Sequence, residues 1–435
     1  MKPGGKKIAI IDYCRTPFMR SGTEYSTMMA WELGRHAVKG LVAKTGIDPK
    51  YIDHIIMGSV ATDIATTNVA REIGLGAGLP ERIPAHTCTV ACISANMAVT
   101  TAADMITSGN ADAVIAGGVE SFSDPDIKVS RAYRRFLLEM TMFSKPKTLG
   151  GKLKLLKKMK LRDFVIPEQP AIGEYSTGMS MVLTAERLAR KLGISREDQD
   201  AFAVRSHHLA AAATKSGELR KEIVPVVAPG KNRASVNDNG PREDTTMEKA
   251  AKLKGVVDKK YGTVTAANSS FLTDGGSAVL VMSEEKARSL GLKPKAYLRS
   301  SVYTGQDLWD ELLLGPAIAI PRVLKQMNLK LADIGVFEIH EAFAAQMLGV
   351  INCLESDALS RSILGLPGRL GKINMDRVNA DGGSLSIGHP FGATGGRLIA
   401  ACCRRMVKEG RKYGLIAGCA AGAVGNAMIL ENAVR

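Results

Sequence analysis

The stretch TCTVACISANMAVTTAADMITSGNADAVIAGG, residues 87–118, contains one unit of the pattern on which the fold is built. A strand-like run over residues 87–91 stops at Cys92, and apolar residues at helical spacing follow over residues 94–108. A buried strand then runs to Gly117 and Gly118. Strand, helix and strand in this order predict an α/β fold, with a mostly parallel sheet and helices on both of its faces.

The same alternation continues towards both ends of the chain. On the N-terminal side, the pattern predicts strands at 7–12 and 53–57 and a helix at 28–44. From residue 295 a second series begins. Its predicted strands are 297–303, 335–339, 413–419 and 426–430, and its predicted helices are 341–353 and 393–408. We therefore predict two similar α/β halves.

The two series are separated by a region of different character. Residues 121–175 are irregular and basic, helical patterns return at 179–192 and 195–215, and residues 228–246 are polar and loop-like. We therefore predict an inserted loop domain. The predicted division is residues 1–120 and 251–292 for the first half, 121–250 for the insertion and 293–435 for the second half.

Composition limits the class of protein. The 435 residues are 45% hydrophobic and 23% charged, as in globular proteins with a real core, and no apolar run is long enough to span a bilayer. The seven cysteines are odd in number and lack paired zinc spacing, which favours free thiols in an intracellular enzyme. Because no secretory or transit segment is visible, we expect a cytoplasmic protein of bacterial type, or a mitochondrial matrix protein if the chain is a mature eukaryotic one.

The formal net charge of +15 is concentrated in one segment. Residues 145–162 hold eight basic residues and no acidic one, with apolar residues near helical spacing between the lysines. Such a basic amphipathic segment predicts contact with a membrane surface or a partner protein. The alternative is a solvated loop over the active site. We exclude nucleic acid as the partner, because aromatic residues do not alternate with the basic ones and no readout motif is present.

Two residues stand where a strand or loop meets a helix. Cys92 precedes a predicted helix, whose N-terminus lowers the pKa of a nearby thiol and favours a nucleophilic thiolate. A buried structural cysteine is the alternative, and this segment alone favours neither. His389 lies in the glycine-rich stretch GGSLSIGHPFGATGG, residues 382–396, where a helix N-terminus would keep its imidazole neutral and basic. A phosphate-binding loop is the alternative, but the spacing matches neither known glycine fingerprint.

Two further residues are candidates only in combination. Cys419 ends a buried strand and is followed by small residues, and by itself core packing is the better interpretation. His340 opens the stretch HEAFAAQ, residues 340–346, at the junction of a strand and a helix. A functional position and a simple helix-capping histidine explain it equally well.

Taken together, Cys92, His340, His389 and Cys419 resemble the catalytic residues of the thiolase family. The resemblance covers nearly the whole chain and rests on motifs in a fixed order. These are CISA from residue 92, GGVES from 117, GTVTAANSS from 262, HEAF from 340, GHPFGATG from 388 and CAAGAVG from 419. Within the family, the chain is most similar to the branch of thiolase (β) subunits of fatty-acid β-oxidation trifunctional complexes. That branch has His-Glu-Ala-Phe where most thiolases have Asn-Glu-Ala-Phe.

The resemblance implies a five-layered α-β-α-β-α core of two duplicated halves, and thiolytic cleavage of 3-ketoacyl-CoA to acetyl-CoA and a shortened acyl-CoA. His389 would take the proton of Cys92, whose thiolate attacks the substrate, and Cys419 would act as general acid and then base. His389 and a donor associated with His340 would hold one oxyanion. The backbone N–H groups of Cys92 and Ala421 would hold the other. No permanent cofactor and no metal are implied, and coenzyme A is a co-substrate.

The resemblance also implies contacts to coenzyme A from Ser270, Met181 and, at the nucleotide end, Arg242. The chain departs from the family pattern at His340, at Ala420-Ala421 in place of Gly-Gly, and at Val182 in place of Gly. Related chains form homodimers and assemble with a hydratase–dehydrogenase α subunit, so these partners are expected here.

Three other functions remain open from the sequence. A condensing ketoacyl synthase shares the fold and uses one cysteine with two histidines, but it has no need of Cys419. Biosynthetic acetoacetyl-CoA formation is the same reaction in reverse. A non-catalytic acyl-CoA-binding subunit would have no reason to keep all four reactive residues. Medium or long acyl chains are the expected substrates.

Overall fold

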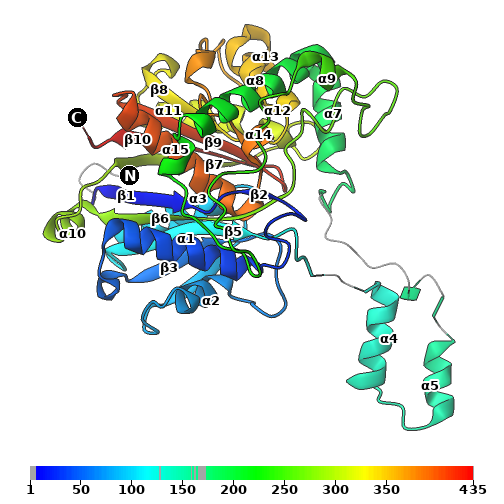
Figure 1. The fold of residues 1–435 in the computed structure, drawn as a ribbon. Coiled ribbons are helices and arrows are strands. Elements are labelled where there is room, and N and C mark those ends of the chain that lie inside the picture. Colours follow the sequence, from blue (N-terminus) through cyan, green and yellow to red (C-terminus); the bar gives the residue numbers. More distant parts are fainter. Residues whose placement is uncertain (1–5, 127–128, 158, 161–162, 165–172, 435) are drawn as a thin grey trace.

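The computed structural model describes residues 6–126, 129–157, 159–160, 163–164 and 173–434 (Figure 1). Its strands form one continuous path in the order β4-β3-β5-β6-β1-β7-β10-β9-β8, with β2 beside β6. The order β3-β5-β6-β1 is repeated by β8-β9-β10-β7, and the two sets join where β1 pairs with β7. The predicted duplication is therefore visible in the topology.

The first half is built from β1 to β6. Its strands are β1 (Ile8–Arg15), β2 (Met19–Arg20), β3 (His54–Gly58), β4 (Ala85–Cys88), β5 (Ala113–Glu120) and β6 (Thr273–Ser283). Its helices are α1 (Ala30–Thr45), α2 (Val69–Gly76), α3 (Ser94–Thr107) and α10 (Glu284–Ser289).

The second half follows the same plan. Its strands are β7 (Ala296–Gly305), β8 (Ile334–Ile339), β9 (Tyr413–Ala420) and β10 (Val424–Asn432). Its helices are α11 (Gly315–Met327), α12 (Ala344–Glu355), α13 (Asp357–Ser362), α14 (Ser384–Ile387) and α15 (Thr394–Lys408).

Successive side chains of a strand point to opposite faces of the sheet and contact different helices, and this arrangement gives five layers. In β5, Val114 joins the apolar cluster that contains α3 and α15, whereas Ile115 joins the cluster that contains α1 and α2. In β9, Ile416 faces the α3 and α15 cluster and Leu415 the cluster of α11 and α12. The predicted order of layers is thus present, with α3 and α15 between the two sets of strands.

The sheet corrects one prediction, because it is mixed rather than mostly parallel. Only the pairs β3–β4, β3–β5 and β8–β9 are parallel, whereas β6, β1, β7 and β10 pair antiparallel with their neighbours. The sequence also predicts a strand near residues 262–266, but this described segment forms a loop. A sequence pattern gives strand positions but not the direction in which neighbours run.

Gly117 and Gly118 lie inside β5, which continues to Glu120, and not at its end as the sequence predicts. A Cβ atom on Gly118 would stand 1.8 Å from the carbonyl oxygen of Gly392, in the loop that carries His389. These glycines are therefore required for close contact between segments far apart in the sequence.

The insertion contains more helix than its composition indicated. It holds α4 (Arg131–Thr141), α5 (Leu149–Leu156), α7 (Met181–Leu192), α8 (Arg196–Lys215) and α9 (Met247–Ala251). Ser195 caps α8 by accepting a hydrogen bond from the backbone N–H of Asp198. In Figure 1, α7 and α8 lie on the layered body, whereas α4 and α5 stand apart from it.

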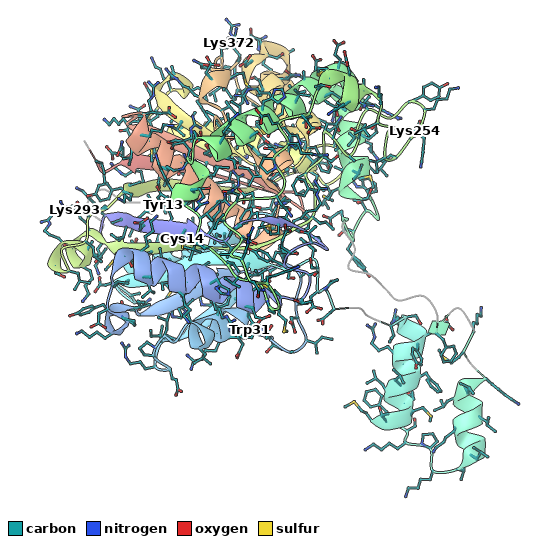
Figure 2. All side chains as sticks on the ribbon, in the orientation of Figure 1. Tyr13, Cys14, Trp31, Lys254, Lys293 and Lys372 are labelled. Atoms are coloured by element: carbon teal, nitrogen blue, oxygen red, sulfur yellow. The ribbon has the colours of Figure 1, made fainter. Side chains whose placement is uncertain are left out.

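Side chains fill the space between the layers. Figure 2 shows Tyr13 and Cys14 within the body and Lys254, Lys293 and Lys372 at its rim. Of the helices that the structure describes, none combines the length and the apolar character needed to cross a bilayer.

Candidate active site

Four reactive side chains lie at the ends of elements that meet in the middle of the molecule. Cys92 lies between β4 and α3, His340 directly follows β8, Cys419 belongs to β9, and His389 lies between α14 and α15. Because β8 and β9 are parallel neighbours, His340 and Cys419 reach the same edge of the sheet. The backbone N–H of His340 donates to the carbonyl of Ala417 at 2.8 Å, which fixes this junction.

The structure brings three of these side chains into one cluster. The sulfur of Cys92 and one ring nitrogen each of His340 and His389 lie within 4.8 Å of one another. The two imidazole rings are 4.1 Å apart between centroids. Cys419 is close enough to Cys92 for the two sulfurs to interact electrostatically. Residues separated by more than three hundred positions in the sequence therefore face one small volume.

A tight turn presents Cys92. Ala91 has a φ of 43°, in the left-handed region, and a small side chain limits the cost of this conformation. The hydroxyl of Ser94 holds the turn from inside, because it accepts from the N–H of Val90 at 2.8 Å and donates to the carbonyl of Ala91 at 2.7 Å. The predicted position of Cys92, just before a helix, is correct.

Hydrogen bonds fix the tautomer of His389. Its Nδ1 lies 2.6 Å from the hydroxyl of Thr394, and that hydroxyl donates its own proton to the carbonyl of Pro390 at 2.9 Å. In this arrangement Thr394 accepts a hydrogen bond from the Nδ1–H group, which leaves a lone pair on Nε2. This Nε2 is buried and has no hydrogen-bond partner among the described residues, so it is available as a base.

His340 is arranged in the opposite sense. Its Nδ1 lies 3.0 Å from the hydroxyl of Ser384, which also accepts a hydrogen bond from Arg397 at 3.2 Å. The hydroxyl proton of Ser384 is then best placed when it is donated to Nδ1 of His340. In that tautomer Nε2 carries the proton, and it too is buried without a described partner. His340 can therefore present an N–H donor to the site.

Both imidazoles are neutral in the free protein. Burial, and then the nearby charge of Arg397, lower the pKa of His340 to about 3. Burial, and then the charges of His340 and Arg397, hold the pKa of His389 well below its usual range. His389 is therefore neutral, as predicted, but the main cause is burial rather than a helix N-terminus.

The pKa of the Cys92 thiol contradicts the prediction from the sequence. Burial raises the pKa of Cys92 to about 12, whereas a helix N-terminus was expected to lower it. The backbone N–H groups of Ala421 and of Cys92 itself act in the expected direction, but desolvation is the larger effect. Burial, and then the neighbouring Cys92, also raise the pKa of Cys419. The resting site therefore holds neutral thiols beside neutral imidazoles.

Comparison with known proteins identifies the family. Residues 8–285 match the model "Thiolase, N-terminal domain", and residues 292–432 match "Thiolase, C-terminal domain". The chain belongs to the thiolase family. It is 48% identical over 430 residues to the mitochondrial trifunctional enzyme subunit beta of Bos taurus, covering 99% of this chain and 89% of the relative.

Two further thiolase relatives place it within the family. A probable 3-ketoacyl-CoA thiolase of Caenorhabditis elegans is 46% identical over 424 residues, covering 98% of this chain and 94% of the relative. The crystal structure of the Bacillus anthracis acetyl-CoA acetyltransferase superposes with a TM-score of 0.82 at 29% identity, covering 99% of this chain and all of that one.

The three residues expected to contact coenzyme A lie at different depths in this thiolase. Ser270 is half-buried, and its N–H donates to the carbonyl of Ala342, two residues beyond His340. Met181 is the half-buried first residue of α7. Arg242 is exposed and lies near enough to Arg20 to lower the pKa of that guanidinium, after the larger effect of burial. Only Ser270 is tied by a described contact to the segment that follows His340.

Sequence reasoning missed the residues that hold the thiolase histidines in place. Thr394 and Ser384 fix the two tautomers, and Arg397 supports Ser384. Glu120 accepts hydrogen bonds from the N–H groups of Ala61 and Gly392, both at 2.9 Å, and so anchors the His389 loop. Thr394 and Glu120 stand inside motifs that the sequence singled out, but their roles depend on partners that no spacing reveals.

Thr394→Val keeps the shape of the side chain and removes the hydroxyl that sets the tautomer of His389. We expect kcat/KM for thiolysis to fall about 10²-fold, since general-base catalysis contributes about 10²–10⁴-fold. Thr394→Ser keeps the hydroxyl and should stay close to the wild type. Steady-state thiolysis assays of the two variants provide the comparison, and equal losses in both would show that the hydroxyl does not act on the base.

The raised pKa of Cys92 makes its reactivity depend on pH. With a pKa of about 12, the thiol is protonated at neutral pH, and the thiolate fraction grows about tenfold per pH unit. Alkylation of Cys92 by iodoacetamide, followed by mass spectrometry of its peptide, should accelerate steadily between pH 7 and pH 9. A plateau below pH 8 would mean that a stable thiolate already exists, and unfolded protein gives the reference rate.

Proposed function

We propose that this protein is a 3-ketoacyl-CoA thiolase, an acetyl-CoA C-acyltransferase of fatty-acid β-oxidation. The observation that carries the proposal is the meeting of the Cys92 thiol with two buried, neutral imidazoles, with the thiol of Cys419 near enough to Cys92 to interact with it. A family relationship over the whole chain supports it, as do relatives whose names include 3-ketoacyl-CoA thiolase. No permanent cofactor is required, and coenzyme A enters as a co-substrate.

Cys92 starts the reaction from its neutral form. Nε2 of His389 accepts the thiol proton while the sulfur attacks C3 of the 3-ketoacyl group. Because both groups are neutral at rest, this proton transfer becomes favourable only as negative charge passes to the C3 oxygen. The N–H groups of Cys92 and Ala421, which already point to the Cys92 sulfur, are suited to hold that oxygen.

Cleavage of the C2–C3 bond leaves the acyl group on Cys92 and an enolate of acetyl-CoA. The enolate oxygen would receive hydrogen bonds from Nε2 of His340 and from the newly protonated His389. Each preorganised donor of this kind typically contributes about 3 kcal/mol to the barrier. The N–H of His340 thus donates the hydrogen bond that the side-chain amide of an asparagine would donate at this position.

Cys419 completes both half-reactions. Its thiol protonates the enolate at C2, and acetyl-CoA leaves. The resulting Cys419 thiolate takes the proton of the incoming coenzyme A, whose thiolate attacks the acyl group on Cys92. The Cys92 sulfur leaves and recovers its proton from His389. The raised pKa of Cys419 suits a group that must be protonated before it acts.

The alternatives are weaker on specific grounds. A ketoacyl synthase would not require Cys419, whose thiol here is near enough to Cys92 to interact with it electrostatically. A non-catalytic subunit would not require the two hydroxyl contacts that fix the histidine tautomers. The biosynthetic direction uses the same site and remains the second candidate. We propose medium to long acyl chains as substrates, because the named relatives include trifunctional enzyme β subunits.

The remaining contacts to coenzyme A follow from charge and position. We assign Ser270 and Met181 to the pantetheine arm. At the nucleotide end we assign Arg242, to which we add Arg20 because it lies beside it. Two guanidinium groups at one place suit a phosphate-bearing ligand.

We also propose that residues 121–250 act as one inserted domain, since β5 ends at Glu120 and the next strand of the first half, β6, begins at Thr273.

The partners proposed are a second copy of this chain and a hydratase–dehydrogenase α subunit. The relatives named trifunctional enzyme subunit beta support an α/β assembly. Such an assembly fits a location in the cytoplasm of a bacterium or in the mitochondrial matrix.

A peripheral membrane contact is proposed for α5 and the basic segment 145–162. On α5, Leu149, Leu153 and Leu156 are 75%, 48% and 44% exposed, beside exposed lysines. A surface of exposed leucine and lysine has affinity for an anionic bilayer, to which each lysine contributes about 1 kcal/mol. Residues 158 and 161–162 of the predicted amphipathic segment lie outside the described residues.

Cys92→Ala should reduce thiolysis of 3-ketohexadecanoyl-CoA by at least about 10⁴-fold, because the acyl-enzyme can no longer form. Cys353→Ala removes a buried thiol of α12 and serves as the matched control. The assay is then repeated with the wild type over acyl chains of four to sixteen carbons. Unchanged activity in Cys92→Ala would refute the assignment, and a preference for four carbons would favour the biosynthetic alternative.

The double variant Lys154→Glu/Lys157→Glu should lose binding to vesicles of phosphatidylglycerol and phosphatidylcholine in a pelleting assay. The control Lys293→Glu/Lys372→Glu changes the net charge equally at exposed positions on the rim (Figure 2) and should still pellet. Equal pelleting of both variants would remove the membrane proposal.

A further inference from the structure

The cluster of Cys92, His340 and His389 has a second chemical property besides acyl transfer. One sulfur and two imidazole nitrogens within 4.8 Å of one another are the ligand types that zinc prefers. His340 and His389 are 1% and 3% exposed, and Nε2 of each lacks a hydrogen-bond partner among the described residues. Two imidazole rings, each with one buried and unpartnered nitrogen atom, thus meet beside a thiol.

The surroundings of the two rings resemble those of metal ligands. A histidine that binds a metal normally has its other ring nitrogen fixed by a hydrogen bond. Here Nδ1 of His389 is held by Thr394 at 2.6 Å and Nδ1 of His340 by Ser384 at 3.0 Å. Zn–S and Zn–N bonds of about 2.3 and 2.0 Å place ligand atoms about 3.5 Å apart. The three atoms lie within 4.8 Å of one another, so no pair needs to approach by more than about 1.3 Å when the side chains rotate to bind the ion.

We propose that the site binds one Zn²⁺ ion through the sulfur of Cys92 and Nε2 of His340 and His389. The fourth position of the tetrahedron is left to water or to an incoming thiol. Binding of the ion does not depend on the proposed thiolase reaction. Inhibition by the ion does depend on that reaction, because a Cys92 whose sulfur is bound to zinc cannot attack an acyl group. The ion would then act as a reversible inhibitor of thiolysis.

The protons balance without a co-reactant. Cys92 loses its thiol proton to solvent when the Zn–S bond forms. His389 already offers a lone pair at Nε2. His340 must move its proton from Nε2 to Nδ1, and Ser384 must turn its hydroxyl to accept from it. Ser384 has two lone pairs, so it can accept from His340 and from Arg397 at the same time.

The test uses the full chain, reduced and stripped of metal with a chelator. Co²⁺ is titrated first, because a thiolate ligand gives a charge-transfer band in the near ultraviolet and tetrahedral geometry gives intense visible bands. Zn²⁺ affinity then follows from competition with a chromophoric chelator. We expect one equivalent of metal with both spectral signatures, and thiolysis that is inhibited by Zn²⁺ and restored by the chelator.

Variants assign the ligands. Cys92→Ala should abolish the thiolate band, and His340→Asn should weaken Zn²⁺ binding at least about 100-fold. Ser384→Ala keeps all three ligands and should weaken it about 10–100-fold, as loss of a supporting hydrogen bond usually does. The matched control is His54→Asn. It removes another histidine, whose Nε2 lies 2.8 Å from Nδ1 of His86, and should bind metal like the wild type.

Three results would overturn the proposal. These are no metal uptake by the wild type, a thiolate band that persists in Cys92→Ala, and loss of binding in His54→Asn. Metal binding with these signatures in a protein that shows no thiolysis would refute the proposed function and leave the zinc site standing. Thiolysis without metal uptake would refute the zinc site and leave the proposed function standing.

Discussion

The packing of α3 against α15 between the two sets of strands is the constraint on which the site depends. Both helices belong to one apolar cluster that also receives strand residues from both halves of the chain. Cys92 precedes α3, and His389 precedes α15 through a short loop. When the duplicated halves close on this central layer, the N-terminal ends of two equivalent helices meet, and each carries one of the reacting groups. Without that contact, neither half has a complete site.

Burial then decides the electrostatics. The site lies deep enough for desolvation to outweigh the helix N-terminus and the backbone N–H groups, so the pKa of Cys92 is raised and that of His389 is lowered. Both shifts oppose a resting thiolate–imidazolium pair. A nucleophile of this kind is protected from unwanted reactions. It becomes reactive only when a substrate oxygen, held by backbone donors, can receive the charge.

The two histidines show how hydroxyl groups divide roles between identical side chains. Thr394 accepts a hydrogen bond from Nδ1 of His389 and leaves Nε2 free as a base, whereas Ser384 donates a hydrogen bond to Nδ1 of His340 and leaves its Nε2 as a donor. The same hydroxyl of Ser384 can turn to accept instead, which would convert His340 into a metal ligand. The presence of histidine at position 340, rather than an amide, is therefore what allows one site to serve acyl transfer and to bind zinc.

The sequence by itself determined the alternation of strands and helices, the duplication and the position of Cys92 before a helix, because these depend on local spacing and on nearby residues. Motifs spread along the chain also pointed to the family. Only the tertiary structure decided that the sheet is mixed, that Gly118 serves close contact with Gly392, and that the pKa of Cys92 is raised. It alone revealed Thr394, Ser384 and Glu120 as partners of the site. Strand direction, close packing and desolvation arise from segments that are distant in the sequence, and no local pattern records them.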